Sequence, residues 1–109
     1  MNLNDMIRDY CRRTGRLTPG EVQTIIAHNR IIATDDGFAV FAWVLDEFHV
    51  LFAYAAPGRR FAALEKATEE YARWNNIKRI KFSTDRPEVF GRRFKGYKPV
   101  ATIMSKELV

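Results

Sequence analysis

Two adjacent arginines, Arg59 and Arg60, follow Pro57-Gly58 at the point where the sequence predicts the start of a helix. A helix N-terminus already carries partial positive charge, so acidic residues are the usual occupants of a first turn. The backbone N–H groups there bind anions, and arginine adds charge-assisted hydrogen bonds to phosphate. The pair therefore indicates an anion-binding site, unless both side chains are simply solvated.

The composition is typical of one folded domain covering residues 1–109. Of these residues 47% are hydrophobic, and 2 Trp, 4 Tyr and 8 Phe can fill a core; about 100–150 residues is the commonest domain size. Cys11 is the only cysteine, which excludes an internal disulfide and a zinc site built from several cysteines. Its place on an apolar stripe predicts a core residue rather than a nucleophile.

No segment of the sequence predicts contact with a membrane. The longest apolar run, Phe38 to Leu45, is far shorter than the roughly 20 residues that cross a bilayer. The N-terminal sequence MNLNDMIRDY lacks the apolar region of a signal peptide. We therefore expect a cytoplasmic protein.

Positive charge is concentrated in the second half of the chain. Residues 1–58 contain 5 Lys/Arg and 7 Asp/Glu, whereas residues 59–109 contain 13 Lys/Arg and 6 Asp/Glu. The candidate partners for such a half are an anionic ligand, a nucleic acid and an acidic protein surface. Solubility alone is the remaining interpretation.

Two helices are predicted before the first strand. The first has one apolar stripe and can end at Thr14-Gly15. Its stripe consists of Leu3, Met6, Ile7, Tyr10 and Cys11. Thr18-Pro19-Gly20-Glu21 then has the pattern of a capping box, with Thr at the cap and Glu three residues later, and predicts a short second helix.

Three β-rich runs follow, and they predict an antiparallel meander. The runs are RIIAT from Arg30, FAVFAWVL from Phe38 and FHVLFAYAA from Phe48. Short polar breaks separate them, as in hairpins. The run from Phe38 is apolar at nearly every position, which favours a central strand covered on both faces.

The remainder of the chain predicts a helix, a strand, a short helix and a last strand. The helix follows Gly58 and ends at Asn75-Asn76, with one side formed by Phe61, Leu64, Thr68, Tyr71 and Trp74. The later segments are the strand IKRIKFST, a short helix opened by Asp85-Arg86-Pro87, and the strand YKPVATIMSKEL. The complete order is α-α-β-β-β-α-β-α-β. The helix between the third and fourth strands is a crossover, so these two strands are expected to be parallel in a mixed α+β sheet.

This order, together with the local sequences AYAAPGRR, ATEEYARWNN, IKRIKFST and GYKPV followed by MSKEL, resembles the GNAT-type N-acetyltransferases. The resemblance is most specific from Phe48 to Leu108. It implies a GNAT-like fold and transfer of an acetyl group from acetyl-coenzyme A to an amine. Small domains of this type are often phage-encoded, which would place the chain in a host cytoplasm.

The resemblance also implies which residues bind the coenzyme, because the family presents a helix N-terminus to its pyrophosphate. These are Tyr54, Ala55, Ala56, Gly58, Arg59, Arg60, Phe61, Ala62, Asp85 and Arg92. Several positions depart from the family pattern. Arg59 and Phe61 stand where the phosphate loop has glycines. Asp85 stands where the family often has Asn, and Arg92 stands where a tyrosine protonates the leaving thiolate.

Candidates for proton transfer lie near the start of FHVLFAYAA and after Gly96. Glu47 and His49, with Asp46, could act as general base for the amine, directly or through water. Tyr97 is the remaining candidate for a catalytic side chain. Each residue also has an ordinary interpretation as a turn, strand or packing residue.

Three functions remain open at this point. The first is a catalytic acetyltransferase, and the second is a GNAT-like domain that binds a host enzyme or a virion protein without catalysis. The third and least supported is a basic nucleic-acid-binding module, because no defined nucleic-acid motif is present. An exposed sheet edge further predicts pairing into a homodimer.

Overall fold

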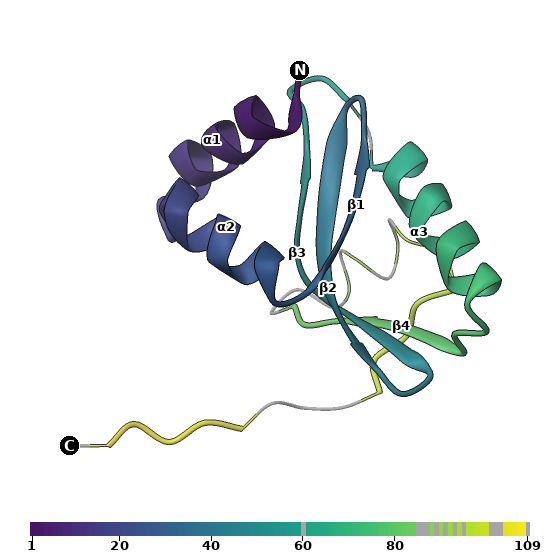
Figure 1. Cartoon of the computed structure of the whole chain (residues 1–109). Coiled ribbons are helices and arrows are strands. Elements are labelled where there is room, and N and C mark those ends of the chain that lie inside the picture. The colour runs from purple at the N-terminus through teal and green to yellow at the C-terminus, as the bar shows by residue number, and fades with distance from the viewer. Residues whose placement is uncertain are drawn as a thin grey trace.

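The computed structural model describes residues 1–59, 61–84, 88, 90, 92, 94, 96–100 and 104–108. The elements it defines are α1 (Leu3–Thr14), α2 (Pro19–Ala27), β1 (Arg30–Thr34), β2 (Gly37–Val44), β3 (Glu47–Ala55), α3 (Ala62–Trp74) and β4 (Arg79–Phe82). Helices α1 and α2 lie on one face of the sheet and α3 lies on the other (Figure 1). Among the helices of the described residues, none has the length and apolar character needed to cross a membrane.

The sheet confirms the predicted meander and crossover. Its strand order is β1-β2-β3-β4. The β1–β2 and β2–β3 pairs are antiparallel, whereas β3 and β4 are parallel. As predicted, β2 is central, and its residues from Phe38 to Phe41 are buried at every position. The protein is therefore an α+β domain with helices on both faces of a mixed sheet.

Local sequence explains where α1 ends and where α2 begins. Thr18 accepts a hydrogen bond from the Glu21 N–H, and the Glu21 carboxylate accepts one from the Thr18 N–H, which completes the capping box. Gly15 ends α1 in the left-handed conformation, with φ of 64°. This conformation costs glycine little, because glycine has no Cβ to clash.

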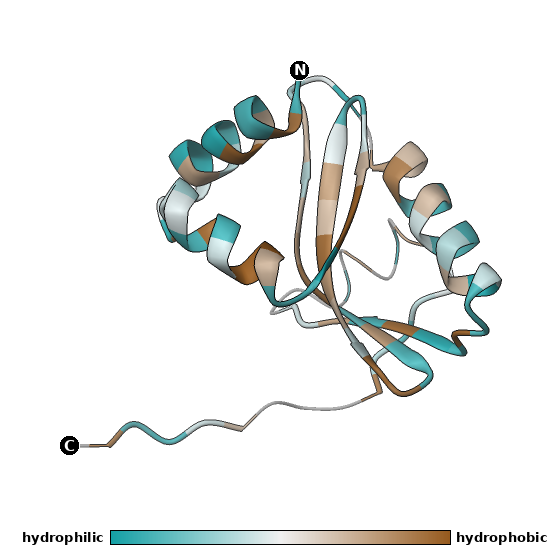
Figure 2. Ribbon diagram, viewed as in Figure 1, coloured by the Kyte–Doolittle hydropathy of each residue, from teal (hydrophilic) through white to brown (hydrophobic). Residues whose placement is uncertain are grey.

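Each face of the sheet has its own hydrophobic core. The core under α1 and α2 contains Met6, Ile7, Cys11, Val22, Phe38, Val40 and Tyr54. The smaller core under α3 contains Phe41, Phe48 and Ala72. Figure 2 shows the hydrophobic residues on the strands and on parts of the helices, with hydrophilic residues elsewhere on the helices. Cys11 is buried, as its stripe predicted.

The third helix begins later than predicted and buries a different stripe. It starts at Ala62, so Arg59 precedes the helix instead of occupying its first turn. Its buried residues are Leu64, Thr68 and Ala72, which recur every four residues. This stripe turns Trp74 away from the sheet and leaves it 90% exposed, so the predicted place of Trp74 on the packed side was wrong.

The predicted last strand is not formed in the part of it that the structure describes. Residues 97–100 and 104–108 have no regular secondary structure, and the latter run away from the body of the molecule (Figure 1). Pro99 has no N–H to donate to a ladder, and Ser105, Lys106 and Glu107 interrupt the apolar alternation of a half-buried strand.

The predicted short helix is supported at the residues described within it. Residues 88, 90 and 92 are helical, and the Phe94 N–H donates to the Phe90 carbonyl at 2.8 Å. The predicted start of this helix, Asp85-Arg86-Pro87, lies outside the described residues.

Candidate functional site

The parallel pairing of β3 with β4 stops partway along β3. Glu47 to Val50 pair with Arg79 to Phe82, and β3 then continues to Ala55 without a β4 partner among the described residues. A β-bulge lies at this point, because Val40 pairs with Phe52 while Phe41 pairs with Val50. A bulge bends its strand and increases the local twist. The edge of β3 from Leu51 onward is therefore open on the side of β4.

A cavity of about 310 Å³ lies beside this open edge. Its wall is formed by β3, by the first turns of α3, by the end of β4, and by described residues of the segment after β4. The β3 residues are Val50, Leu51, Phe52 and Ala53, and the α3 side contributes Phe61, Leu64, Glu65 and Thr68. A mainly apolar wall with a few polar groups is typical of small-molecule sites.

Aromatic rings form the wall of the cavity that faces away from β3. Phe82 is the centre of this group, with ring centroids 5.5 Å from Phe90, 6.2 Å from Phe94 and 5.2 Å from Tyr97. Phe61 joins it through Phe94, at 6.2 Å. Phe61 therefore forms part of the cavity wall.

Two ionisable side chains lie in this apolar wall. Burial raises the pKa of the Glu65 carboxyl, and neighbouring Glu69 raises it further. Burial also raises the pKa of Tyr97 to about 12, with Glu65 and then Glu69 adding to the effect. The cavity wall thus contains the Glu65 carboxyl, which is a weaker acid than usual, and the Tyr97 phenol, which is protonated at neutral pH.

Glu65 was not among the residues predicted from the sequence. Its charge suggested the solvated side of α3, but it lies four residues after Phe61, at helical spacing on the same side. The four-residue spacing from Phe61 was the signal in the sequence that could have identified Glu65. Tyr97, by contrast, was predicted as a catalytic candidate and does line the cavity.

The predicted general bases lie outside the cavity wall. The Glu47 carboxylate contacts Lys81 Nζ at 2.5 Å and Arg79 at 3.4 Å. The hydrogen bond from Lys81, with the charges of Lys81 and Arg79, holds the pKa of Glu47 below its usual value. Glu47 thereby links β3 to β4 across the parallel pair. His49 is exposed on the same strand.

The turn that precedes α3 holds Arg59 against the β1–β2 turn. The Arg59 guanidinium lies 3.6 Å from the Asp36 carboxylate, and the Arg59 N–H donates to the Ala56 carbonyl at 2.9 Å. The Ala56 N–H in turn donates to the Asp36 carbonyl at 2.7 Å. Gly58 makes the turn with φ of 74°. The Arg59 N–H is therefore used within the protein, whereas its side chain remains largely exposed.

The other predicted coenzyme residues lie on separate elements. Tyr54 is buried on the α1 face, and its hydroxyl donates to the Asp9 carboxylate at 2.6 Å. Ala55 ends β3, and Ala62 begins α3 and is exposed. Arg92 is exposed and donates from Nε to the Glu88 carbonyl at 3.3 Å. Arg60 and Asp85 lie outside the described residues.

Comparison of the sequence with models of protein families and with curated proteins finds no match. Among the described residues, no three His, Cys, Asp or Glu side chains lie close enough together to hold a metal ion. The open edge of β3 and its adjoining cavity are therefore the features on which a functional assignment must rest.

Proposed function

We propose that this chain is a GNAT-like N-acetyltransferase that holds the thioester of acetyl-coenzyme A in the cavity between β3, β4 and α3. The observation that carries the proposal is the end of β3–β4 pairing at Val50 and Phe82. It leaves a strand edge with hydrogen-bonding groups beside an apolar cavity. The resemblance of residues 48–108 to the GNAT family supports the same assignment.

The open strand edge accounts for how the thioester carbonyl is activated. A backbone N–H of the segment from Leu51 to Ala53 donates to the carbonyl oxygen and stabilises the negative charge that develops on it. The acceptor amine attacks the carbonyl carbon, the new C–N bond forms, and the C–S bond then breaks. Holding amine and thioester together supplies much of the rate without a strong acid or base.

Two side chains of the cavity wall supply the proton transfers. Glu65, whose pKa is raised by burial, takes the proton that the amine loses as the C–N bond forms. Tyr97, with a pKa of about 12, is protonated at neutral pH and gives its proton to the leaving thiolate. The products are an amide and free coenzyme A.

The start of α3 is the proposed site for the coenzyme phosphates. The first N–H groups of a helix have no partner within the helix and attract anions. No side chain caps α3 among the described residues. The exposed Arg59 guanidinium adds positive charge at the same end.

Calorimetric titration with acetyl-coenzyme A tests the proposal, followed by detection of free thiol after addition of amines. Ala53 lines the cavity, so we expect Ala53→Phe to fill it and to weaken binding at least about tenfold, equivalent to about 1.4 kcal/mol. Thr24→Phe, on the exposed side of α2 and outside the cavity wall, is the control and should bind like the wild type. No heat at millimolar ligand with the wild-type chain would contradict the proposal.

A second candidate is a GNAT-like domain that binds its partners without transfer. It is favoured by the ion pairs that occupy Arg59 and Glu47, since these residues are then not free for phosphate binding or base catalysis. The partner would be a host enzyme or a virion protein. Coenzyme binding without thiol release across a panel of amines, or no coenzyme binding at all, would favour this candidate over the first.

A further inference from the structure

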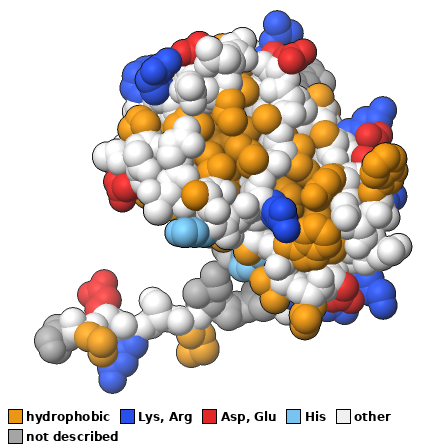
Figure 3. Space-filling model, viewed as in Figure 1, with side chains coloured by type: hydrophobic (Ala, Val, Ile, Leu, Met, Phe, Trp, Pro, Cys, Tyr) orange, Lys and Arg blue, Asp and Glu red, His pale blue; other side chains and the backbone are white. Residues whose placement is uncertain are grey.

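The outer edge of β1 is open. β1 is the first strand in the order β1-β2-β3-β4, and no strand pairs with its outer side among the described residues. Protein sheets usually protect such an edge with Lys, Pro or a bulge. Between its terminal Arg30 and Thr34, β1 contains only Ile31, Ile32 and Ala33. Figure 3 shows hydrophobic side chains gathered over the part of the surface that carries β1 and β2.

We propose that two copies of this chain pair antiparallel along β1, with the twofold axis at Ile32. In this register Ile32 lies opposite Ile32, Ile31 opposite Ala33, and Arg30 opposite Thr34. Ile32 packs with the core under α3, and Ile31 packs with the core under α1 and α2. The pairing therefore extends both cores and joins the two sheets into one.

The charges at the two ends of β1 favour a second copy in the antiparallel orientation. Arg30 begins the strand, and Asp35 follows its end in the β1–β2 turn. Antiparallel pairing in this register places Arg30 opposite Thr34 of the other copy, directly before its acidic turn Asp35-Asp36. Opposite charges therefore lie near each other at both ends of the paired strands. Parallel pairing would place Arg30 directly beside Arg30 of the other copy and is disfavoured by repulsion.

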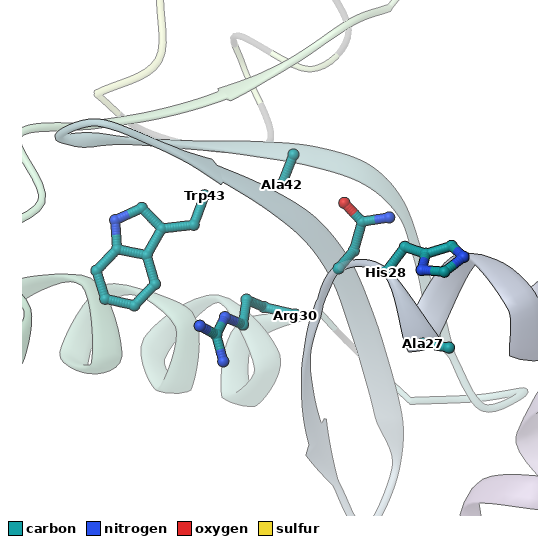
Figure 4. A pocket seen from close by; sticks show the side chains of 6 residues that line it. Ala27, His28, Arg30, Ala42 and Trp43 are labelled. Atoms are coloured by element: carbon teal, nitrogen blue, oxygen red, sulfur yellow. The ribbon is translucent and has the colours of Figure 1, made fainter.

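A groove lies at the start of β1. The proposed register places the acidic turn of the other copy, Asp35-Asp36, at this groove. Its volume is about 460 Å³, and it is lined by Ala27, His28, Asn29, Arg30, Ala42 and Trp43. Figure 4 shows the Arg30 guanidinium beside the Trp43 indole, and its carbon atom Cζ lies 5.6 Å from the ring centroid. The register puts Asp35 of the partner opposite Asn29 and Asp36 opposite His28. Both Asn29 and His28 line the groove.

Sedimentation of charge-reversed variants tests this pairing. Arg30→Asp places a carboxylate near the acidic turn of the other copy at each end of the paired strands, and Asp35→Arg places a guanidinium near Arg30 of the other copy at the same ends. We expect each variant alone to dimerise at least about tenfold more weakly than the wild type, since like charges then face each other. An equimolar mixture should recover the dimer, because both contacts in the mixed pair join opposite charges or restore the original ones.

A charge control outside β1 and a crosslinking experiment complete the test. Arg16→Asp makes the same charge change outside β1 and should leave dimerisation unchanged, and circular dichroism checks that every variant is folded. Ile32→Cys should crosslink two copies on mild oxidation, because residues directly opposite in antiparallel strands have Cβ atoms about 4.5–5.5 Å apart. Thr24→Cys, on exposed α2, should not. A monomeric wild type at millimolar concentration, or a mixture no tighter than its components, would overturn the proposal.

Discussion

Asp9 and Tyr54 form the polar contact that joins α1 to the buried face of β3. The Tyr54 hydroxyl donates to Asp9 at 2.6 Å, and Arg12 and Arg13 contact the same carboxylate. The hydrogen bond from Tyr54, followed by that from Arg12, lowers the pKa of Asp9. A lowered pKa in the folded state means that the ionised carboxylate stabilises the fold.

We expect Asp9→Asn to be less stable than the wild type at pH 7. The contribution of Asp9 is present above the pKa of the unfolded chain, near about 3.9. It is lost as the pH falls through the lower folded value. The difference between variant and wild type in urea unfolding should therefore shrink between pH 5 and pH 2, about the range in which such carboxylates titrate. A difference that stays constant over this range would contradict the role assigned to the Asp9 charge.

At the cavity, replacement of Glu65 tests its proposed role in proton transfer separately from the proposed binding of the coenzyme. Glu65→Gln keeps the shape of the side chain but cannot accept the proton, so we expect the transfer rate to fall about 100-fold or more. Binding of acetyl-coenzyme A should change little. In the wild type, the rate should fall as the pH drops through the raised pKa of Glu65.

Glu70→Gln is the matched control for Glu65→Gln, because Glu70 is exposed on the same helix. Rates of thiol release, measured from pH 5 to pH 9 for both variants, test whether Glu65 accepts the proton. An unchanged rate and pH profile in Glu65→Gln would remove Glu65 from the proposed mechanism.

At the scale of elements, β2 and β3 approach each other closely at Gly37, the first residue of β2. A Cβ added at Gly37 would lie 2.3 Å from the backbone oxygen of Tyr54, a distance that requires the strands to move apart. We expect Gly37→Ala to cost about 1–3 kcal/mol, as overpacked sites do. Thermal and urea unfolding would measure this loss.

Gly20→Ala is the control for Gly37→Ala. Gly20 lies in α2, and an added Cβ there meets no atom closer than Thr18 Oγ1 at 4.0 Å. The replacement should be neutral or should stabilise the chain by about 0.5–1 kcal/mol, because alanine loses less entropy in a helix than glycine. Equal losses in both variants would show that close approach at Gly37 is not the cause.

The elements with strong local signals were predictable from sequence. The stripe from Leu3 to Cys11, the Thr18 capping box and the apolar run from Phe38 each act through near neighbours, and the structure confirms the elements they predict. The segment after Gly96 has no local signal of comparable strength. Its β-rich residues suggested a strand, but a strand needs a partner edge, and sequence pattern alone does not report whether one is available.

At the scale of the whole molecule, the cavity depends on where two distant segments stop pairing. Val50 and Phe82 are 32 positions apart, and the bulge at Leu51 arises from its register with Val40 and Phe41. Nothing in the residue types of these positions specifies that register. Sequence reasoning therefore identified Phe61 and Tyr97 near the site but missed Glu65 and the aromatic group around Phe82.

The measurement that tests the central claim most directly is a titration of the isotope-labelled chain with acetyl-coenzyme A, followed by amide NMR. If the thioester binds in the cavity between β3, β4 and α3, saturable shifts should concentrate at the amides of Leu51, Phe52, Ala53 and Leu64. The Ala53→Phe variant should show them only at higher ligand concentration, and Thr24→Phe should match the wild type. The absence of shifts at millimolar ligand, or shifts confined to residues outside the cavity wall, would contradict the claim.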